Sequence, residues 1–208
     1  MIKTQQRTYE GHGRLPNSAH TSRPWRIHEI VPDFRLEDVW ALPTSGRADE
    51  FPILVEGFAT ADPAKTLPHA ARALWSLRWK LGDLFGLDDP DSGIGPRVTT
   101  LRKRLPDDLR GAVGPEFDSL PFTSLYLTDE EFAAEIANQT MHGVLHLGWV
   151  AEGDSYRGQM AVYVRPNGLL GNAYMAAIKP FRHLVVYPQM FRAMERRWHE
   201  RPDRESPA

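Results

Sequence analysis

Apolar residues recur every three or four positions along one stretch of the chain, at Leu67, Ala70, Ala71, Leu74, Leu77, Leu81, Leu84 and Phe85. This spacing places them on one face of a helix, so the pattern predicts an amphipathic helix over 67–85 that ends at Gly86. The same spacing recurs near the C-terminus, at Phe181, Leu184, Val185, Pro188, Phe191, Met194 and Trp198. It predicts a closing helix that Pro188 starts or kinks.

Residues 122–179 contain short segments in which apolar and polar positions alternate, separated by turn residues. Consecutive strands with no helix between them are typical of an antiparallel meander. Residues 128–138 are ambiguous, because the capping-box pattern there and the run EEFAAEIAN favour a helix by propensity. We expect a strand, because the pairing of the hairpins described below requires one in this segment. We also expect a strand over 172–179, with either Met175 or Tyr174 on the inward face, depending on the length of the preceding loop.

Two hairpins make the register of this meander testable. A two-residue turn at Asn138 and Gln139 would set Ile136 opposite Met141, Phe132 opposite Leu145, and Glu135 opposite His142. A turn at Gly153 and Asp154 would set Leu145 opposite Val162, and Leu147 opposite Met160. Both hairpins then place their apolar residues on one face, together with Trp149, whereas a one-residue slip would scatter them.

Shorter patterns predict the elements of the N-terminal third. Alternation over 25–30 predicts a strand that stops at Pro32. Asp33 is a candidate cap for a brief helix that runs through Trp40. The apolar run over 51–58 is compatible with another strand.

The remaining segments lack a hydrophobic period. Residues 1–23 are polar and aperiodic, which predicts a flexible N-terminal arm, and 201–208 predict a flexible tail. Gly, Pro and charged residues over 88–121 predict a long surface excursion with one helical turn. A single domain is therefore expected over 24–200, a length that can bury a sizeable core.

Several phrases of the sequence resemble an uncharacterised bacterial family known as a domain of unknown function: ARALWSLRWKLGDLFG at 71–86, PFTSLYLTDEE, EIANQTMHGVLHLGWV at 135–150, and GQMAVYVRPNGLLGNAYMAAIKPFRHLVVYP at 158–188. The order of elements also resembles START-like (SRPBCC) domains. That resemblance implies an α+β helix-grip fold, in which a curved antiparallel sheet wraps a long C-terminal helix. It further implies a cavity between sheet and helix that often holds an apolar small molecule.

Composition excludes several classes of protein. The 208 residues include no cysteine, which rules out a disulfide scaffold, a thiolate metal site and a cysteine nucleophile. With 25 basic and 27 acidic residues, there is no broad positive surface for nucleic acid. No apolar run approaches the roughly 20 residues of a membrane span, and the N-terminus has no apolar signal core. We expect a cytoplasmic protein, and the sequence carries no indication of its oligomeric state.

Candidate chemistry is sparse. His142 and His146 are four apart, which in a strand separates them by about 13 Å, too far for one zinc ion, so we expect neither a metal nor another cofactor. They fall on the face opposite Leu145, which we expect to be a polar outer face. The weak catalytic candidates are Glu56, Glu135, His142 and His146, of which Glu135 and His142 could act as an acid and base pair.

The bulky and adaptable apolar residues are the better candidates for a site. We expect a cavity lined by Trp75, Trp79, Leu145, Leu147, Trp149, Met160, Val162, Met175, Met190 and Met194. The expected function is therefore the binding of a small, mostly apolar molecule. Two alternatives remain open: a cyclase- or dehydratase-like enzyme that uses the same cavity, and a partner-binding domain with a solid core.

Overall fold

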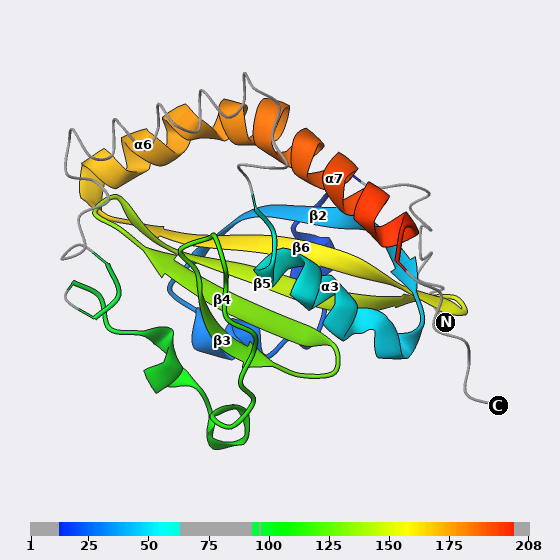
Figure 1. The fold of residues 1–208 in the computed structure, drawn as a ribbon. Coiled ribbons are helices and arrows are strands. Elements are labelled where there is room, and N and C mark those ends of the chain that lie inside the picture. The colour runs from blue at the N-terminus through cyan, green and yellow to red at the C-terminus, as the bar shows by residue number, and fades with distance from the viewer. Residues whose placement is uncertain (1–12, 63–92, 96, 202–208) are drawn as a thin grey trace, which may run out of the picture.

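The computed structural model describes residues 13–62, 93–95 and 97–201 of the chain. Its strands form one six-stranded antiparallel sheet in the order β1-β2-β6-β5-β4-β3 (Figure 1). They are β1 (Gly13–Leu15), β2 (Arg35–Gly46), β3 (Thr123–Leu127), β4 (Glu131–Ala137), β5 (Met141–Glu152) and β6 (Ser155–Pro166). The fold class is therefore α+β, as predicted.

The described helices are α1 (Ser18–Thr21), α2 (Ile27–Ile30), α3 (Phe51–Ala59), α6 (Gly168–Phe181) and α7 (Tyr187–His199). A π-helical turn, η5 (Arg182–Val186), joins the last two without a break, and short 3-10 helices are η1 (Ala48–Glu50), η3 (Leu101–Arg104) and η4 (Asp107–Leu109). None of the helices in the described ranges combines the length and apolar composition needed to cross a bilayer.

The sheet separates two hydrophobic cores. We call the side covered by α3 and the α6-η5-α7 arch the pocket face (Figure 1); its buried core includes Leu42, Phe51, Phe132, Leu147, Trp149 and Met160. We call the other side the polar face, because the histidines and glutamates of β4 and β5 lie there. Its core packs α2, η3 and η4 on the strands through Ile27, Ile30, Leu101, Leu105, Leu109 and Leu125.

The predicted register is confirmed for the β5-β6 hairpin and is wrong for the β4-β5 hairpin. In β5 and β6, Leu145 pairs with Val162 and Leu147 with Met160, as predicted. In β4 and β5, Phe132 pairs with Leu147 instead of Leu145. The turn is longer than predicted because the Asn138 side chain accepts the N–H groups of two residues beyond it, at 2.9 and 3.1 Å. The resulting shift of two residues leaves every side chain on its predicted face.

The strand expected over 172–179 is wrong, because this segment belongs to α6. Gly168 has a φ of 63°, which suits glycine, and it turns the chain from β6 into the helix. Asn167 fixes this corner by donating to the carbonyls of Asn138 and Gln139 at 3.1 and 3.0 Å. The predicted closing helix is present, but it begins at Gly168, well before Phe181.

The N-terminal third differs most from expectation. Residues 25–30 contain a helix rather than a strand, 33–40 enter strand β2 rather than a helix, and 51–58 form helix α3. These runs are only six to eight residues long, so their periodicity does not separate helix from strand.

Two segments expected to lie at the surface or to be flexible take part in the core. Residues 13–23, assigned above to a flexible arm, form β1 and α1 and bury His20 completely. The described part of the expected surface excursion buries Leu101, Leu105 and Leu109. The amphipathic helix predicted over 67–85 lies outside the described residues.

Candidate ligand-binding site

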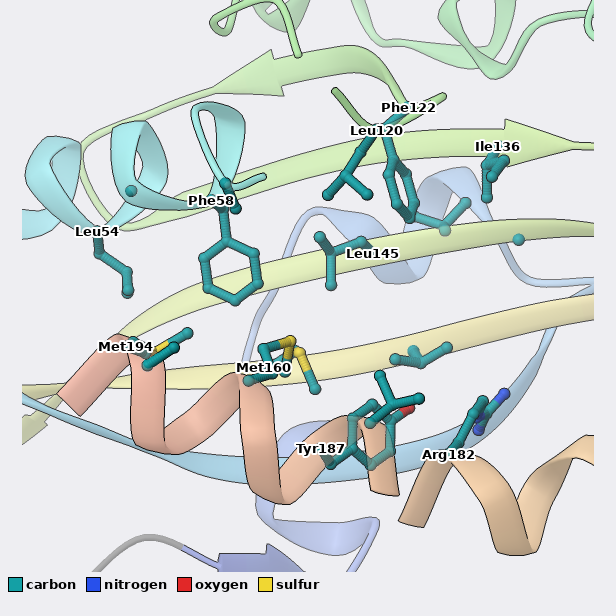
Figure 2. Close-up of a pocket in the computed structure, with 18 of the residues that line it drawn as sticks. Leu54, Phe58, Leu120, Phe122, Ile136, Leu145, Met160, Arg182, Tyr187 and Met194 are labelled. Atoms are coloured by element: carbon teal, nitrogen blue, oxygen red, sulfur yellow. The ribbon is translucent and has the colours of Figure 1, made fainter. Parts of the chain in front are cut away.

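A cavity of about 420 Å³ lies between the pocket face of the sheet and helices α3, α6 and α7 (Figure 2). Its apolar wall includes Leu54 and Phe58 from α3, Leu145, Met160 and Val162 from the strands, and Met175, Met190 and Met194 from the helical arch. Strand alternation explains this lining, because Leu145 and Val162 are paired neighbours on one face. The volume is within the range of small-molecule sites, about 300 to 1,000 Å³.

One polar group lies beside this apolar wall, at the bend of the helical arch. The wider π turn brings Arg182 and Tyr187 to one side, where the N–H of Tyr187 bonds to the carbonyl of Arg182. Both side chains line the cavity and lie beside each other in Figure 2. Both donate to Oδ2 of Asp38, Arg182 through Nη2 and Tyr187 through its hydroxyl at 3.3 Å. Asp38 is fully buried on β2, so it fixes the positions of both donors.

The charges around Asp38 are unequal. Oδ1 of Asp38 lies 2.8 Å from His183 Nε2 and 3.8 Å from Arg14 Nη2. Burial raises the pKa of Tyr187 above its usual range, Arg182 opposes this shift, and the charge of Asp38 adds to it. Tyr187 therefore keeps its proton at neutral pH and can act as a hydrogen-bond donor beside the cavity.

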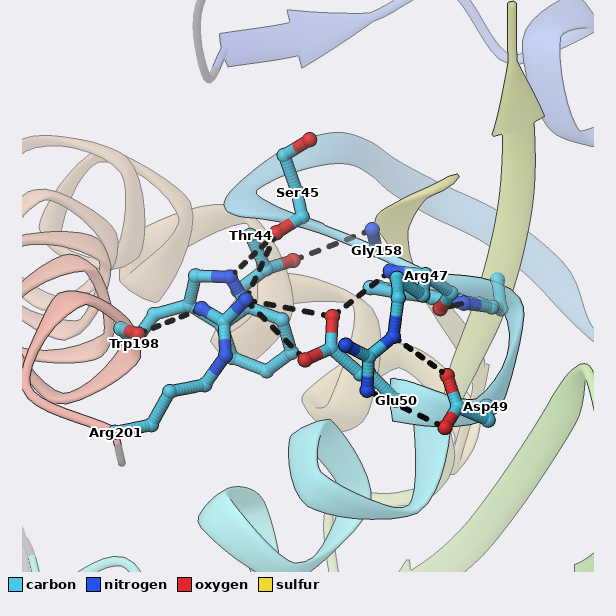
Figure 3. Close-up of polar contacts among 9 residues, drawn as sticks. Thr44, Ser45, Arg47, Asp49, Glu50, Gly158, Trp198 and Arg201 are labelled. Carbon is cyan, nitrogen blue, oxygen red and sulfur yellow. Dashed lines mark hydrogen bonds and ion pairs between the residues drawn. The ribbon is translucent and has the colours of Figure 1, made fainter. Parts of the chain in front are cut away.

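The far end of the cavity is closed by a set of polar contacts that we call the helix-end contacts (Figure 3). Trp198 Nε1 donates to the carbonyl of Ser45 at 2.8 Å, and Arg201 Nη1 donates to the carbonyl of Trp198 at 2.7 Å. The Arg201 guanidinium lies 4.1 Å from the centroid of the Trp198 ring and 3.4 Å from the carboxylate of Glu50. Glu50 in turn accepts the N–H of Arg47 at 2.8 Å. These contacts hold the end of α7 against the turn after β2.

The predicted ligand-binding residues divide into three groups. Those that line the cavity are Leu145, Met160, Val162, Met175, Met190 and Met194. Leu147 and Trp149 lie in the solid core of the pocket face, with 0% and 1% of their surface exposed, and Trp149 Nε1 donates to the carbonyl of Arg47 at 2.9 Å. Trp75 and Trp79 lie outside the described residues.

The predicted catalytic candidates are not at the cavity. Glu56 is exposed on α3, and Glu135, His142 and His146 lie on the polar face. That face is not an outer surface as predicted, because 0% of Glu135, 5% of His142 and 0% of His146 is exposed. Each histidine contacts a glutamate of β4, His142 with Glu135 at 2.9 Å and His146 with Glu131 at 3.2 Å. Glu135 and His142 are thus in contact, although Glu135 pairs with Val144 in the sheet and not with His142 as predicted.

The two glutamates fasten irregular segments to the sheet. Glu131 accepts the N–H of Arg26 through both carboxylate oxygens, each at 3.0 Å, and the hydroxyl of Tyr126 at 3.0 Å. Glu135 accepts the N–H of Leu101 at 3.1 Å and the hydroxyl of Thr100. These hydrogen bonds explain why both glutamates are buried. Glu131 holds the start of α2 and Glu135 holds the start of η3, so both act as parts of the scaffold.

A group of three histidines, of which His20 and His146 are fully buried, adjoins Glu131. The ring of His20 lies 4.8 Å from that of His146 and 5.2 Å from that of His28, and His20 Nδ1 lies 2.8 Å from Oε1 of Gln159. Burial lowers the pKa of His20 to about 3, with the charge of His146 adding to the shift. Burial also lowers the pKa of His146, although Glu131 opposes this. Both rings are therefore neutral at neutral pH.

The polar group at the cavity was missed from the sequence. Asp38 and Arg182 are 144 positions apart, and a helix was expected where β2 carries Asp38. The available indication was the pair of acidic residues Glu37 and Asp38 between the apolar positions Leu36 and Val39, which is unusual for the interior of a strand.

Comparison with known proteins gives the family of this chain. No curated protein and no solved structure matches it. A family model described as "Protein of unknown function (DUF2867)" matches residues 30–189, which run from the end of α2 to the start of α7. The matched range includes the sheet from β2 to β3, most of the cavity lining, and Asp38, Arg182 and Tyr187. Because this match covers most of the sequence, the chain belongs to the DUF2867 family.

Proposed function

We propose that this protein binds a small, mostly apolar molecule in the cavity between the sheet and the α6-η5-α7 arch. We further propose that the arch and the antiparallel sheet form a helix-grip fold of the START-like kind. The observation that carries the proposal is the cavity itself, about 420 Å³ in volume and lined mainly by aliphatic, methionine and phenylalanine side chains.

The chemistry of the lining supports binding by hydrophobic burial. Each square ångström of apolar surface removed from water contributes about 25 cal/mol, so a ligand that fills such a cavity gains affinity without many polar contacts. Met160, Met175, Met190 and Met194 have flexible side chains that adapt to ligands of different shape.

An enzyme that uses Glu56, Glu135 or His146 on a bound ligand receives less support. Glu56 is exposed and does not belong to the described lining of the cavity. Glu135 and His146 lie on the polar face, on the far side of the sheet, and their hydrogen bonds are made to other parts of the scaffold. A binding role needs none of these groups.

The proposal can be tested with Nile red, a neutral apolar fluorophore whose emission rises in apolar surroundings. The pocket variant is Ile178→Trp, because Ile178 lines the cavity. The matched control is Leu184→Trp on the same arch, because Leu184 is 77% exposed and does not line the cavity. We expect the wild type and Leu184→Trp to bind Nile red equally, and Ile178→Trp to bind it at least about tenfold more weakly, since the indole occupies part of the cavity.

Two results would overturn the proposal. One is a wild-type protein that leaves the fluorescence of Nile red unchanged, and this result does not depend on any variant. The other is equal binding by Ile178→Trp and Leu184→Trp when circular dichroism shows both to be folded.

A further inference from the structure

We infer that the ligand of this cavity carries a carboxylate, which binds to Arg182 beside the hydroxyl of Tyr187. The inference rests on the proposed function and adds the chemical class of the ligand, an apolar monocarboxylic acid. It is based on the hydrogen-bonding capacity of Arg182, on the balance of charge around Asp38, and on the composition of the cavity lining.

Arg182 has donors that the protein leaves unused. Its side chain is 15% exposed and lines the cavity, yet only Nη2 donates to a described residue, Asp38. Its Nε is buried and has no hydrogen-bond partner in the described part of the chain. A buried donor without an acceptor is costly, whereas a guanidinium can hold a carboxylate through two parallel N–H bonds. A ligand carboxylate would use this spare capacity after a small rotation of the side chain.

The charge around Asp38 favours an anion over a neutral acceptor. Asp38 contributes one negative charge, and Arg14 and Arg182, both within 4.0 Å of its carboxylate, contribute one positive charge each. The Arg14 side chain is 50% exposed, so water screens part of its charge, and a fraction of one positive charge remains around Asp38 when His183 is neutral. The neighbouring Glu37 does not cancel it, because Glu37 has its own cations, Arg35 and Lys179.

The described lining contains three arginines and no carboxylate. Of these, Arg197 is exposed, so its charge is screened by water and contributes little to affinity. Arg201 is already engaged with Glu50 and with the carbonyl of Trp198. The Arg182 side chain is 15% exposed and that of Arg201 is 24% exposed, so the attraction of Arg182 for an anion is screened least. This difference selects Arg182 among the three.

The test compares dodecanoate with methyl dodecanoate, two probes with the same chain of which only the first is charged at pH 8. Each probe is titrated against protein preloaded with Nile red, and displacement gives its affinity. We expect wild type to prefer the acid over the ester by about tenfold or more. Arg182→Gln should abolish this preference, with each displacement corrected for the variant's own affinity for Nile red, whereas the control Arg197→Gln should keep the preference.

Because Arg182→Gln leaves Asp38 without its main cation, the double variant Asp38→Asn with Arg182→Gln removes both charges together and provides a second measurement. Equal affinity of wild type for acid and ester would overturn the inference while leaving the proposed function intact. Loss of the preference in Arg197→Gln but not in the Arg182 variants would also overturn it. If Nile red fails to bind wild type, the proposed function fails first.

Discussion

On the pocket face of the sheet, apolar side chains of β5 and β6 border a cavity, whereas on the polar face β5 buries histidines against the glutamates of β4. Leu145 faces the cavity, while its neighbour His146 is fully buried against Glu131 and the ring of His20. The two faces therefore use their side chains in opposite ways: polar side chains are buried in a core on one face, and apolar side chains border a cavity on the other.

This contrast indicates different roles for the two faces, one in stability and the other in binding. A buried polar group is costly unless it is hydrogen-bonded, and the bonds that Glu131 and Glu135 accept fix one arrangement of α2, η3 and the strands. Apolar side chains need no hydrogen-bond partners, so most of the pocket face can surround a cavity at no such cost. The exception is the Asp38 group, where Nε of Arg182 is buried without a partner among the described residues. The polar face thus supplies a rigid scaffold, and the pocket face is free to receive a ligand.

The largest expected effect comes from breaking the polar face. Glu131→Ala would leave the N–H of Arg26, the hydroxyl of Tyr126 and the ring of His146 without their acceptor. Each buried donor without a partner costs about 1 to 3 kcal/mol, so we expect the free energy of unfolding to fall by about 4 kcal/mol or more. Urea unfolding followed by circular dichroism measures this.

The control is Glu56→Ala on the pocket side, which removes an exposed glutamate of the same charge. We expect a change within about 0.5 kcal/mol, as for most surface substitutions. Similar losses for the two variants would contradict the idea that Glu131 fastens the scaffold.

The next effect compares truncations on the two faces. Leu125 is fully buried in the core of the polar face, and Leu125→Ala is expected to lower the free energy of unfolding by about 3 kcal/mol. Met190 borders the cavity and is only partly buried, so Met190→Ala enlarges an existing space and should cost about 1 kcal/mol. Chemical denaturation of both variants decides the matter, and an equal cost would mean that the cavity lining is packed as tightly as the polar face.

A smaller effect appears with pH and belongs to the polar face alone. Burial lowers the pKa of His20 from 6.5 to about 3 and also lowers the pKa of His146. Below pH 6.5 the unfolded chain therefore binds protons that the folded protein does not. The free energy of unfolding should fall as pH drops below 6.5, by up to about 1.4 kcal/mol per pH unit for His20, and His146 adds to this loss.

Unfolding by urea at pH 7.5, 6.5 and 5.5 measures this slope above the range in which carboxylates titrate. Burial tends to raise the pKa of Glu131, but the hydrogen bond and charge of His146 lower it below its usual 4.5, so this group adds to the loss only at lower pH. The variant His20→Gln should retain the loss that is due to His146 and show a clearly shallower slope. An unchanged slope would mean that His20 does not titrate with folding.

The sequence was informative where the determinants of structure are local. The β5-β6 register was predictable because Leu145 and Leu147 alternate regularly and a short turn containing Gly153 joins the strands. The segment after Asn167 was not, because its small and apolar residues fit a helix and a strand equally well. What decides there is the contact of Asn167 with the β4-β5 turn, which lies 28 positions earlier.

The same distinction explains the site. The cavity residues of β5 and β6, and Met190 and Met194 of α7, were predictable from strand and helix periodicity, whereas Met175 was expected on a strand and lines the cavity from α6. The burial of Glu131 and the pairing of Asp38 with Arg182 were not, because they depend on contacts across 105 and 144 positions. From the sequence alone, an isolated charged residue is expected at the surface, and only the segment that packs over it in the fold shows that it is buried.

The smallest effect compares one partly exposed arginine from each side of the sheet. Arg201 belongs to the helix-end contacts of the pocket face, and Arg104, beside the polar face, pairs with Asp33 at 2.5 Å. Exposed ion pairs contribute about 0 to 1 kcal/mol, so Arg201→Ala and Arg104→Ala should each change the free energy of unfolding by less than about 1 kcal/mol.

The two variants should differ in ligand binding rather than in stability. Arg201 lines the cavity and stacks on Trp198, so its removal loosens the end of α7 and should weaken Nile red binding about two- to fivefold. Arg104 is not part of the described lining, and Arg104→Ala should bind as wild type does. If both variants bound Nile red alike, the end of α7 would not control access to the cavity. If only Arg201→Ala were impaired, the two faces would be separable in function as they are in chemistry, since one contributes to affinity and the other to stability alone.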